Sequence, residues 1–375
     1  MAMGEVFTPR RVIPVMAPGL ISLVLGGLGG IGIMWSWAGT SFPIKLEVTQ
    51  HFYLMIAGFF AALIGNELLN VLSMEWSGRQ AGGITLALYA ALLWALLAGT
   101  VAGAAWLSSA AYLAMLLVLI TYSRTYLKPS KMGFRPSAYN YLIVASLAAS
   151  IALYITAWIG GGDLGVAMLI FPVSMIYAVM ARDIALVTGR RPARERLGVL
   201  AFLLLVASFA MWTFGIVEAA GALLAASGAA SILFSGVAQY ARTEKLFSYV
   251  KIWSAYLWLM AAGLILFLGA PTLWRDVATH ALALGFIFNI VFGVDVILID
   301  MIATQMQKRI VVKPRRGVPI LEVVTFLLLN VGMLARAGYA YAYTPSLAVV
   351  SGPLVGIAIV AFLLYTQRRL MQLSA

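Results

Sequence analysis

The sequence predicts an all-α, polytopic membrane protein of twelve transmembrane helices. Hydrophobic residues make up 63% of the 375 positions, whereas charged residues make up only 10%. A soluble domain is about 25% charged, and apolar windows of roughly 20 residues, which recur along this chain, are typical of helices that cross a bilayer.

Twelve apolar windows define the predicted spans, with their ends placed to within a few residues. In chain order they lie near residues 13–37, 48–74, 82–101, 103–122, 137–159, 164–182, 197–216, 218–239, 248–269, 276–300, 318–339 and 346–365. Every longer polar stretch lies between two spans, so we expect residues 1–375 to form a single integral membrane domain. The first window is too long for the apolar core of a signal peptide, and we expect it to be retained.

Lysine and arginine test this count, because cytoplasmic loops are enriched in them and real spans make rich and poor loops alternate. All but three of the 25 basic residues fall before the first span or near the cytoplasmic ends of later ones. In chain order these are Arg10, Arg11, Arg79, Arg124, Lys128, Lys131, Arg135, Arg182, Arg190, Arg191, Arg194, Arg196, Arg242, Lys245, Lys251, Lys308, Arg309, Lys313, Arg315, Arg316, Arg368 and Arg369. Lys45, Arg275 and Arg336 lie on the other side. The pattern predicts a multi-pass protein of the cell (inner) membrane with both termini cytoplasmic.

Charge and composition also exclude several kinds of function. The net charge of +12 belongs to cytoplasmic loops, so it does not indicate nucleic acid as a partner. Cysteine is absent, which excludes disulfide scaffolds, thiol nucleophiles and CxxC zinc modules. The glycine runs at 26–32 and 160–162 follow no predicted strand, and close helix packing is their expected role.

The chain has two histidines, His51 and His280, in the second and tenth predicted spans. His51 lies four residues past Glu47 and His280 five past Arg275, so at about 1.5 Å per residue both lie about 6 to 8 Å inside the outer boundary. Two neutral imidazoles at one depth suit the axial positions of a b-type haem. The alternative is that both are ordinary interfacial histidines.

The neighbouring residues agree with a haem site. Met55 and Gly58 share the face of His51, and this narrow stripe leaves room for a flat macrocycle, although small residues also simply let helices approach. Haem propionates need cations, and Arg336 and Arg275 are candidates at the right depth. The alternative for Arg336 is that its side chain extends to the outer headgroups.

The segment "HFYLMIAGF" at 51–59 resembles the signature W-H-x-H-E-M-x-x-G-F of the NnrS family of haem-containing membrane proteins, with His51, Met55, Gly58 and Phe59 matching. The segment that begins "THALALGF" is similar to a later H-A-L-x-x-G block of that family, through His280 to Gly285. The resemblance implies a bundle like the catalytic subunit of haem–copper oxidases, with haem b iron ligated by helices 2 and 10. It also implies electron transfer or a response linked to nitric oxide, with a quinone or a redox protein as partner.

The sequence departs from that family at three positions of the first motif. Tyr53 replaces the second histidine, Leu54 the glutamate and Gln50 the tryptophan. A haem–copper dinuclear centre needs further histidines on the middle helices, and the chain has none there. We therefore expect a haem protein without a dinuclear centre, and whether it is an enzyme stays open.

A second hypothesis is a twelve-helix secondary transporter that uses acidic residues inside the membrane. Asp295, Glu67 and Asn66 are its candidate coupling residues, because ionisable groups in lipid are costly and are often functional. Hydrogen bonding between helices is the simpler explanation of these residues. A third hypothesis is a non-catalytic scaffold subunit.

Overall fold

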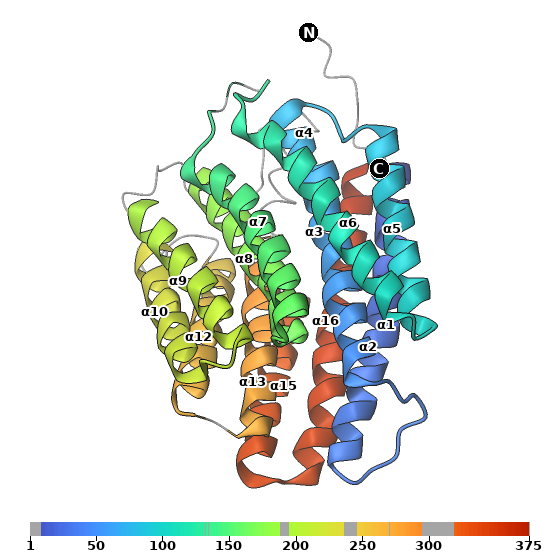
Figure 1. The fold of residues 1–375 in the computed structure, drawn as a ribbon, viewed down its shortest axis with the longest axis vertical. Coiled ribbons are helices and arrows are strands. Elements are labelled where there is room, and N and C mark those ends of the chain that lie inside the picture. The colour runs from blue at the N-terminus through green and yellow to red at the C-terminus, as the bar shows by residue number, and fades with distance from the viewer. Residues whose placement is uncertain are drawn as a thin grey trace. The chain divides into compact units, whose positions relative to one another are not determined.

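The computed structural model describes residues 9–131, 133, 135–187, 195–235, 246–269, 271–294 and 319–374. Every element in these ranges is helical, and none of the described residues forms a strand (Figure 1). Twelve helical segments of this described part are long and apolar enough to cross a membrane. The chain is therefore an all-helical, multi-pass membrane protein.

The spans lie where hydropathy predicts them. Their bounds are Arg10–Trp37, Val48–Ser77, Gly83–Val101, Ala105–Leu127, Ala138–Gly160, Leu164–Arg182, Glu195–Thr213, Val217–Ser235, Phe247–Phe267, Thr272–Val294, Ile320–Ala342 and Pro345–Thr366. The prediction is confirmed, with ends that differ by a few residues. The predicted ends of the eighth and tenth spans, at 239 and 300, and the predicted start of the eleventh, at 318, lie outside the described residues.

The chain divides into two compact units. Unit 1 comprises residues 1–36, 40–179 and 213–215, and unit 2 comprises residues 37–39, 180–212 and 216–375. His51 belongs to unit 1 and His280 to unit 2.

Unit 1 contains the first five spans and most of the sixth. Its helices are α1 (Pro9–Trp37), α2 (Val48–Phe52), η1 (Tyr53–Phe60), α3 (Ala61–Asn66), η2 (Glu67–Val71), α4 (Leu72–Ser77), α5 (Gly83–Val101), α6 (Ala105–Ser123), the short 3₁₀ helix η3 (Arg124–Leu127), α7 (Ala138–Gly160) and α8 (Leu164–Val187). The second span starts with a capping box, in which the Gln50 side chain accepts a hydrogen bond from the Glu47 backbone N–H at 3.1 Å. Two π-helical segments, η1 and η2, interrupt this span.

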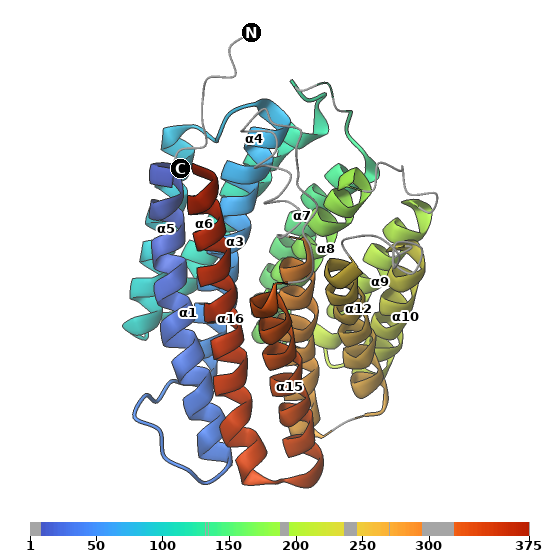
Figure 2. The same cartoon turned by 180° about the vertical axis from the view of Figure 1, so that it is seen from behind.

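Unit 2 contains the last six spans. Its helices are α9 (Glu195–Thr213), α10 (Val217–Ser235), α12 (Leu246–Phe267), α13 (Thr272–His280), the π-helix η4 (Ala281–Phe286), α15 (Ile320–Ala342) and α16 (Pro345–Ser374). Helices α10 and α12 approach closely because Gly228 lies against the backbone of Met260 and Gly263 against that of Ala225. Helices α15 and α16 follow one another in the chain and lie side by side (Figure 2).

Candidate functional site

His51 lies near the end of α2, and its ring packs on α1. Its Nδ1 is 2.9 Å from the backbone oxygen of Gly26. A carbonyl oxygen only accepts hydrogen bonds, so Nδ1 carries the proton of the neutral ring and the lone pair resides on Nε2. This tautomer suits metal ligation, because ligating histidines usually donate their other N–H to a carbonyl or carboxylate.

The His51 ring packs directly against Gly30 of α1. A Cβ on Gly30 would lie 2.7 Å from the ring Cε1, and glycine is the residue that leaves this space. Within the glycine run at 26–32, Gly26 and Gly30 serve close packing against the second span, as expected from the sequence, whereas a Cβ on Gly27 would meet nothing within 4 Å.

The Gly30→Ala substitution should displace the imidazole and destabilise the protein by about 1–3 kcal/mol, the usual cost of overpacking. Gly27→Ala is the matched control, since nothing lies within 4 Å of a Cβ at that position of the same helix. Both changes raise helix propensity equally, so the difference between them isolates the contact with His51. The measurement is thermal unfolding of the two purified variants, and equal stabilities would contradict the role assigned to Gly30.

The stripe beside His51 also packs against α1. A Cβ on Gly58 would meet the Ser22 side chain at 2.5 Å, and a Cβ on Gly26 would meet the Met55 sulfur at 2.8 Å. Within unit 1 the packing of α1 thus accounts for the small residue at Gly58. Met55 lies beside His51 on this interface.

The hydroxyl of Tyr53 joins three helices. It lies 2.7 Å from the Ser109 hydroxyl on α6 and 2.8 Å from the Tyr154 hydroxyl on α7. Tyr154 also donates to Ser109 at 2.9 Å, which closes a ring of three buried hydroxyls. Tyr53 therefore ties the second span to α6 and α7.

His280 is the last residue of α13, and its Nδ1 meets two oxygens of one residue. The Asp276 backbone oxygen is 2.9 Å away and the Asp276 carboxylate oxygen Oδ1 is 3.1 Å away. Both oxygens are acceptors, so Nδ1 of this ring also carries a proton, and in the neutral ring Nε2 holds the lone pair. His280 thus adopts the same tautomer as His51.

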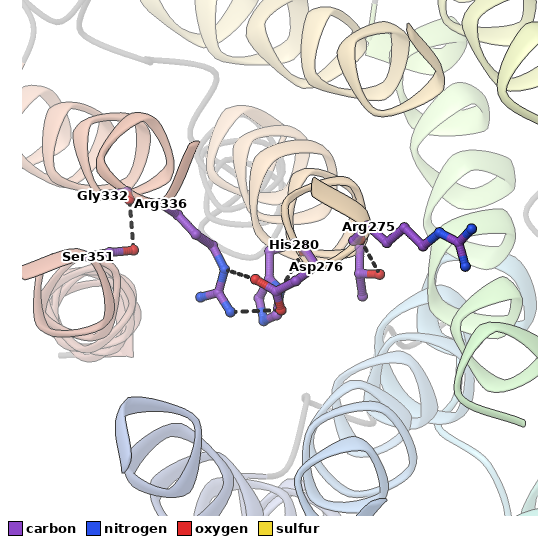
Figure 3. Close-up of polar contacts among 7 residues, drawn as sticks. Arg275, Asp276, His280, Gly332, Arg336 and Ser351 are labelled. Carbon is purple, nitrogen blue, oxygen red and sulfur yellow. Dashed lines mark hydrogen bonds and ion pairs between the residues drawn. The ribbon is translucent and has the colours of Figure 1, made fainter. Parts of the chain in front are cut away.

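Arg336 of α15 holds Asp276 in place through two hydrogen bonds (Figure 3). Its Nε donates to Oδ2 at 2.7 Å and its Nη2 to Oδ1 at 3.0 Å, a bidentate pair of the strong kind. The Arg336 side chain is only 9% exposed, so it does not extend to the headgroups. A carboxylate of unit 2 already compensates this cation, and a propionate would have to share it.

Arg275 behaves differently from Arg336. Its side chain is exposed and points away from Asp276 and His280 (Figure 3). Asp276, which is not among the site residues predicted from the sequence, is instead the residue that connects the cation to the histidine. Its position one helical turn before His280 is the signal that could have identified it.

Both histidines stand at the start of π-helical segments. His51 lies two residues before the start of η1, and His280 is directly followed by η4. π-Helical turns are rare and occur frequently at functional sites. This local geometry is shared by two residues from distant parts of the chain.

The structure gives less information on Asp295, Glu67 and Asn66, the candidate coupling residues of the transporter hypothesis. Asn70 donates to the side chain of Asn66 at 3.0 Å within the second span, and Glu67 begins η2 between them. Asp295 lies outside the described residues. Within the described part of the chain, no three His, Cys, Asp or Glu side chains gather as a metal-ion site would require.

No protein-family model matches this chain, and no curated protein matches it. The resemblance to the NnrS family therefore stays a prediction from two short motifs.

Proposed function

We propose that this chain is a haem b protein of the membrane, with His51 and His280 as the two axial ligands and electron transfer as its activity. One observation carries the proposal: each histidine has its Nδ1 within 2.9 Å of a backbone carbonyl oxygen, which directs the lone pair to Nε2. Neutral imidazole of this tautomer is the usual haem ligand, and the two residues are the only histidines in the sequence. Bound haem b supplies one-electron oxidation and reduction of its iron.

The surroundings of the two ligands support unequal roles for them. The His280 ring is held by a charged chain, Arg336 to Asp276 to the imidazole, which makes the ring a stronger electron donor to a metal. The His51 ring is held by a neutral carbonyl and by the close packing of Gly30. His51 is thus the ligand that a competing molecule, such as nitric oxide, would displace first.

An absorbance spectrum of the purified protein tests the proposal. We expect one haem b per chain, with a Soret band and the sharp reduced bands of a low-spin, six-coordinate iron. Since both axial positions are filled, carbon monoxide should bind slowly or not at all to the reduced protein. A colourless preparation from haem-supplemented cells would refute the proposal, and fast, stoichiometric carbon monoxide binding would refute two firm ligands.

A further inference from the structure

Unit 2 contains a buried ion pair far along the chain from either histidine. Lys251 of α12 and Glu322 of α15 approach to 3.0 Å between Nζ and Oε2, and their side chains are 0% and 4% exposed. The ammonium also donates to the Phe292 backbone oxygen at 3.2 Å and stands 5.0 Å from the centre of the Phe247 ring. The sequence pattern groups Lys251 with the loop cations, but the structure buries it inside the helices.

Tyr365 of α16 extends this hydrogen-bonded pair toward the end of the last membrane span. Its hydroxyl donates to the second carboxylate oxygen of Glu322, Oε1, at 2.7 Å. Tyr365 is only partly buried and lies one residue before the end of its span at Thr366. The three residues thus form a hydrogen-bonded chain from a buried ammonium to a partly buried tyrosine.

Two charges in such a place are costly, because removing an ion from water takes several kcal/mol even when it is paired. Transfer of one proton from Lys251 Nζ to Glu322 Oε2 gives an amine and a carboxylic acid, both neutral and still hydrogen-bonded. The neutral pair avoids the cost of removing two charges from water. The charged pair and the neutral pair are therefore close in free energy. When Glu322 instead takes up a proton from outside the pair, the Lys251 ammonium keeps the Phe292 backbone oxygen and the face of the Phe247 ring as partners, which compensate part of its charge.

We propose that Lys251, Glu322 and Tyr365 form a proton-exchange site that opens toward the membrane side predicted to be cytoplasmic. Tyr365 passes its hydroxyl proton to Glu322 Oε1 and takes one from a hydronium ion of the adjoining water, which leaves a water molecule, so Tyr365 itself is unchanged. Glu322 becomes a carboxylic acid while Lys251 stays an ammonium. The site therefore alternates between net charge zero and net charge plus one, and its ligand is a single proton.

The surrounding elements bring few other titratable groups to this end of the unit. Tyr249 lies on α12 itself, two residues from Lys251. On α10, Glu218 lies beside Gly269, at the opposite end of α12. The groups of α13, Arg275, Asp276 and His280, stand about 18 Å or more along the helix from Phe292, and Arg336 lies 14 residues beyond Glu322 on α15. Glu322 accepts hydrogen bonds from both Lys251 and Tyr365, so it is the carboxylate of this hydrogen-bonded chain that can take up the proton.

The role that we assign to this site, proton uptake when the haem is reduced, rests on the proposed function. An electron that arrives on the haem adds a negative charge to a low-dielectric region, and a proton taken up at Glu322 would offset it. Reduction would then bind protons, so the midpoint potential should fall as the pH rises. Unit 2 contains both His280 and the proton site.

Infrared spectroscopy of the protein in detergent tests the site with or without haem. Difference spectra between acidic and alkaline buffer should show the C=O stretching band of a protonated, buried carboxyl, and Glu322→Gln should remove it. Glu218→Gln is the matched control, since Glu218 is exposed. Tyr365→Phe should keep the band and shift its frequency, because only the hydrogen bond to Oε1 is lost.

The variant Glu322→Gln leaves Lys251 without its carboxylate, so the double variant Lys251→Met/Glu322→Gln serves if the single variant does not fold. A difference spectrum of the wild type identical to that of the single or the double variant would overturn the proposal. In the haem-loaded protein, pH-indicator absorbance should show proton uptake on reduction, up to about one per haem, that the double variant lacks. A protein without haem would refute the proposed function alone, because the infrared test is unaffected.

Discussion

Replacing either His51 or His280 with alanine is expected to abolish low-spin haem and to leave the protein inserted in the membrane. The two imidazoles are the only ones in the chain, so no third histidine can substitute. Insertion depends on the hydropathy of twelve spans, none of which needs an imidazole. The effect should be a loss of essentially all of the six-coordinate spectrum, measured on membranes and on purified protein.

Thr279→Ala is a suitable control for the histidine variants, because it truncates the neighbour of His280 and removes only a hydrogen bond to the Arg275 backbone. It should retain full haem content. Full haem content in both histidine variants would contradict the assignment of the ligands.

The second large effect concerns stability. Replacing Arg336 with methionine should destabilise the protein by about 3 kcal/mol, since it leaves the mostly buried carboxylate of Asp276 without its cation. The double variant Arg336→Met/Asp276→Asn should recover much of this loss, because both charges are then gone. Thermal or denaturant unfolding in detergent measures the difference.

The control for Arg336 is Arg275→Met. Arg275 is exposed and points away from Asp276, so its removal should leave stability nearly unchanged (Figure 3). If both arginine variants proved equally stable, the ion pair would not hold α13 to α15. If Arg275→Met lowered the haem potential more than Arg336→Met, Arg275 would be the propionate partner expected from the sequence.

The fold class could be predicted from the sequence because the signal that specifies it is local. Whether a helix crosses a bilayer depends on the summed hydropathy of about 20 consecutive residues, and each window can be assessed alone. The twelve spans follow from this sum. The equal depth expected for the two histidines does not, because His51 lies three residues after the start of its span at Val48 and His280 eight residues after the start of its span at Thr272. Close packing could likewise be predicted for Gly26 and Gly30 of the run at 26–32, although the residues they contact could not be named.

The partners of the polar residues depend on which helix faces meet, and only the tertiary structure decides this. Arg336 and Asp276 are 60 residues apart and Lys251 and Glu322 are 71 apart, so no local pattern pairs them. For the same reason the sequence pattern groups Lys251 with loop cations and leaves Arg336 to reach either a propionate or the headgroups. A charge inside a bilayer must find its partner across a helix interface, and the sequence by itself determines that the charge is there, whereas packing determines which partner it finds.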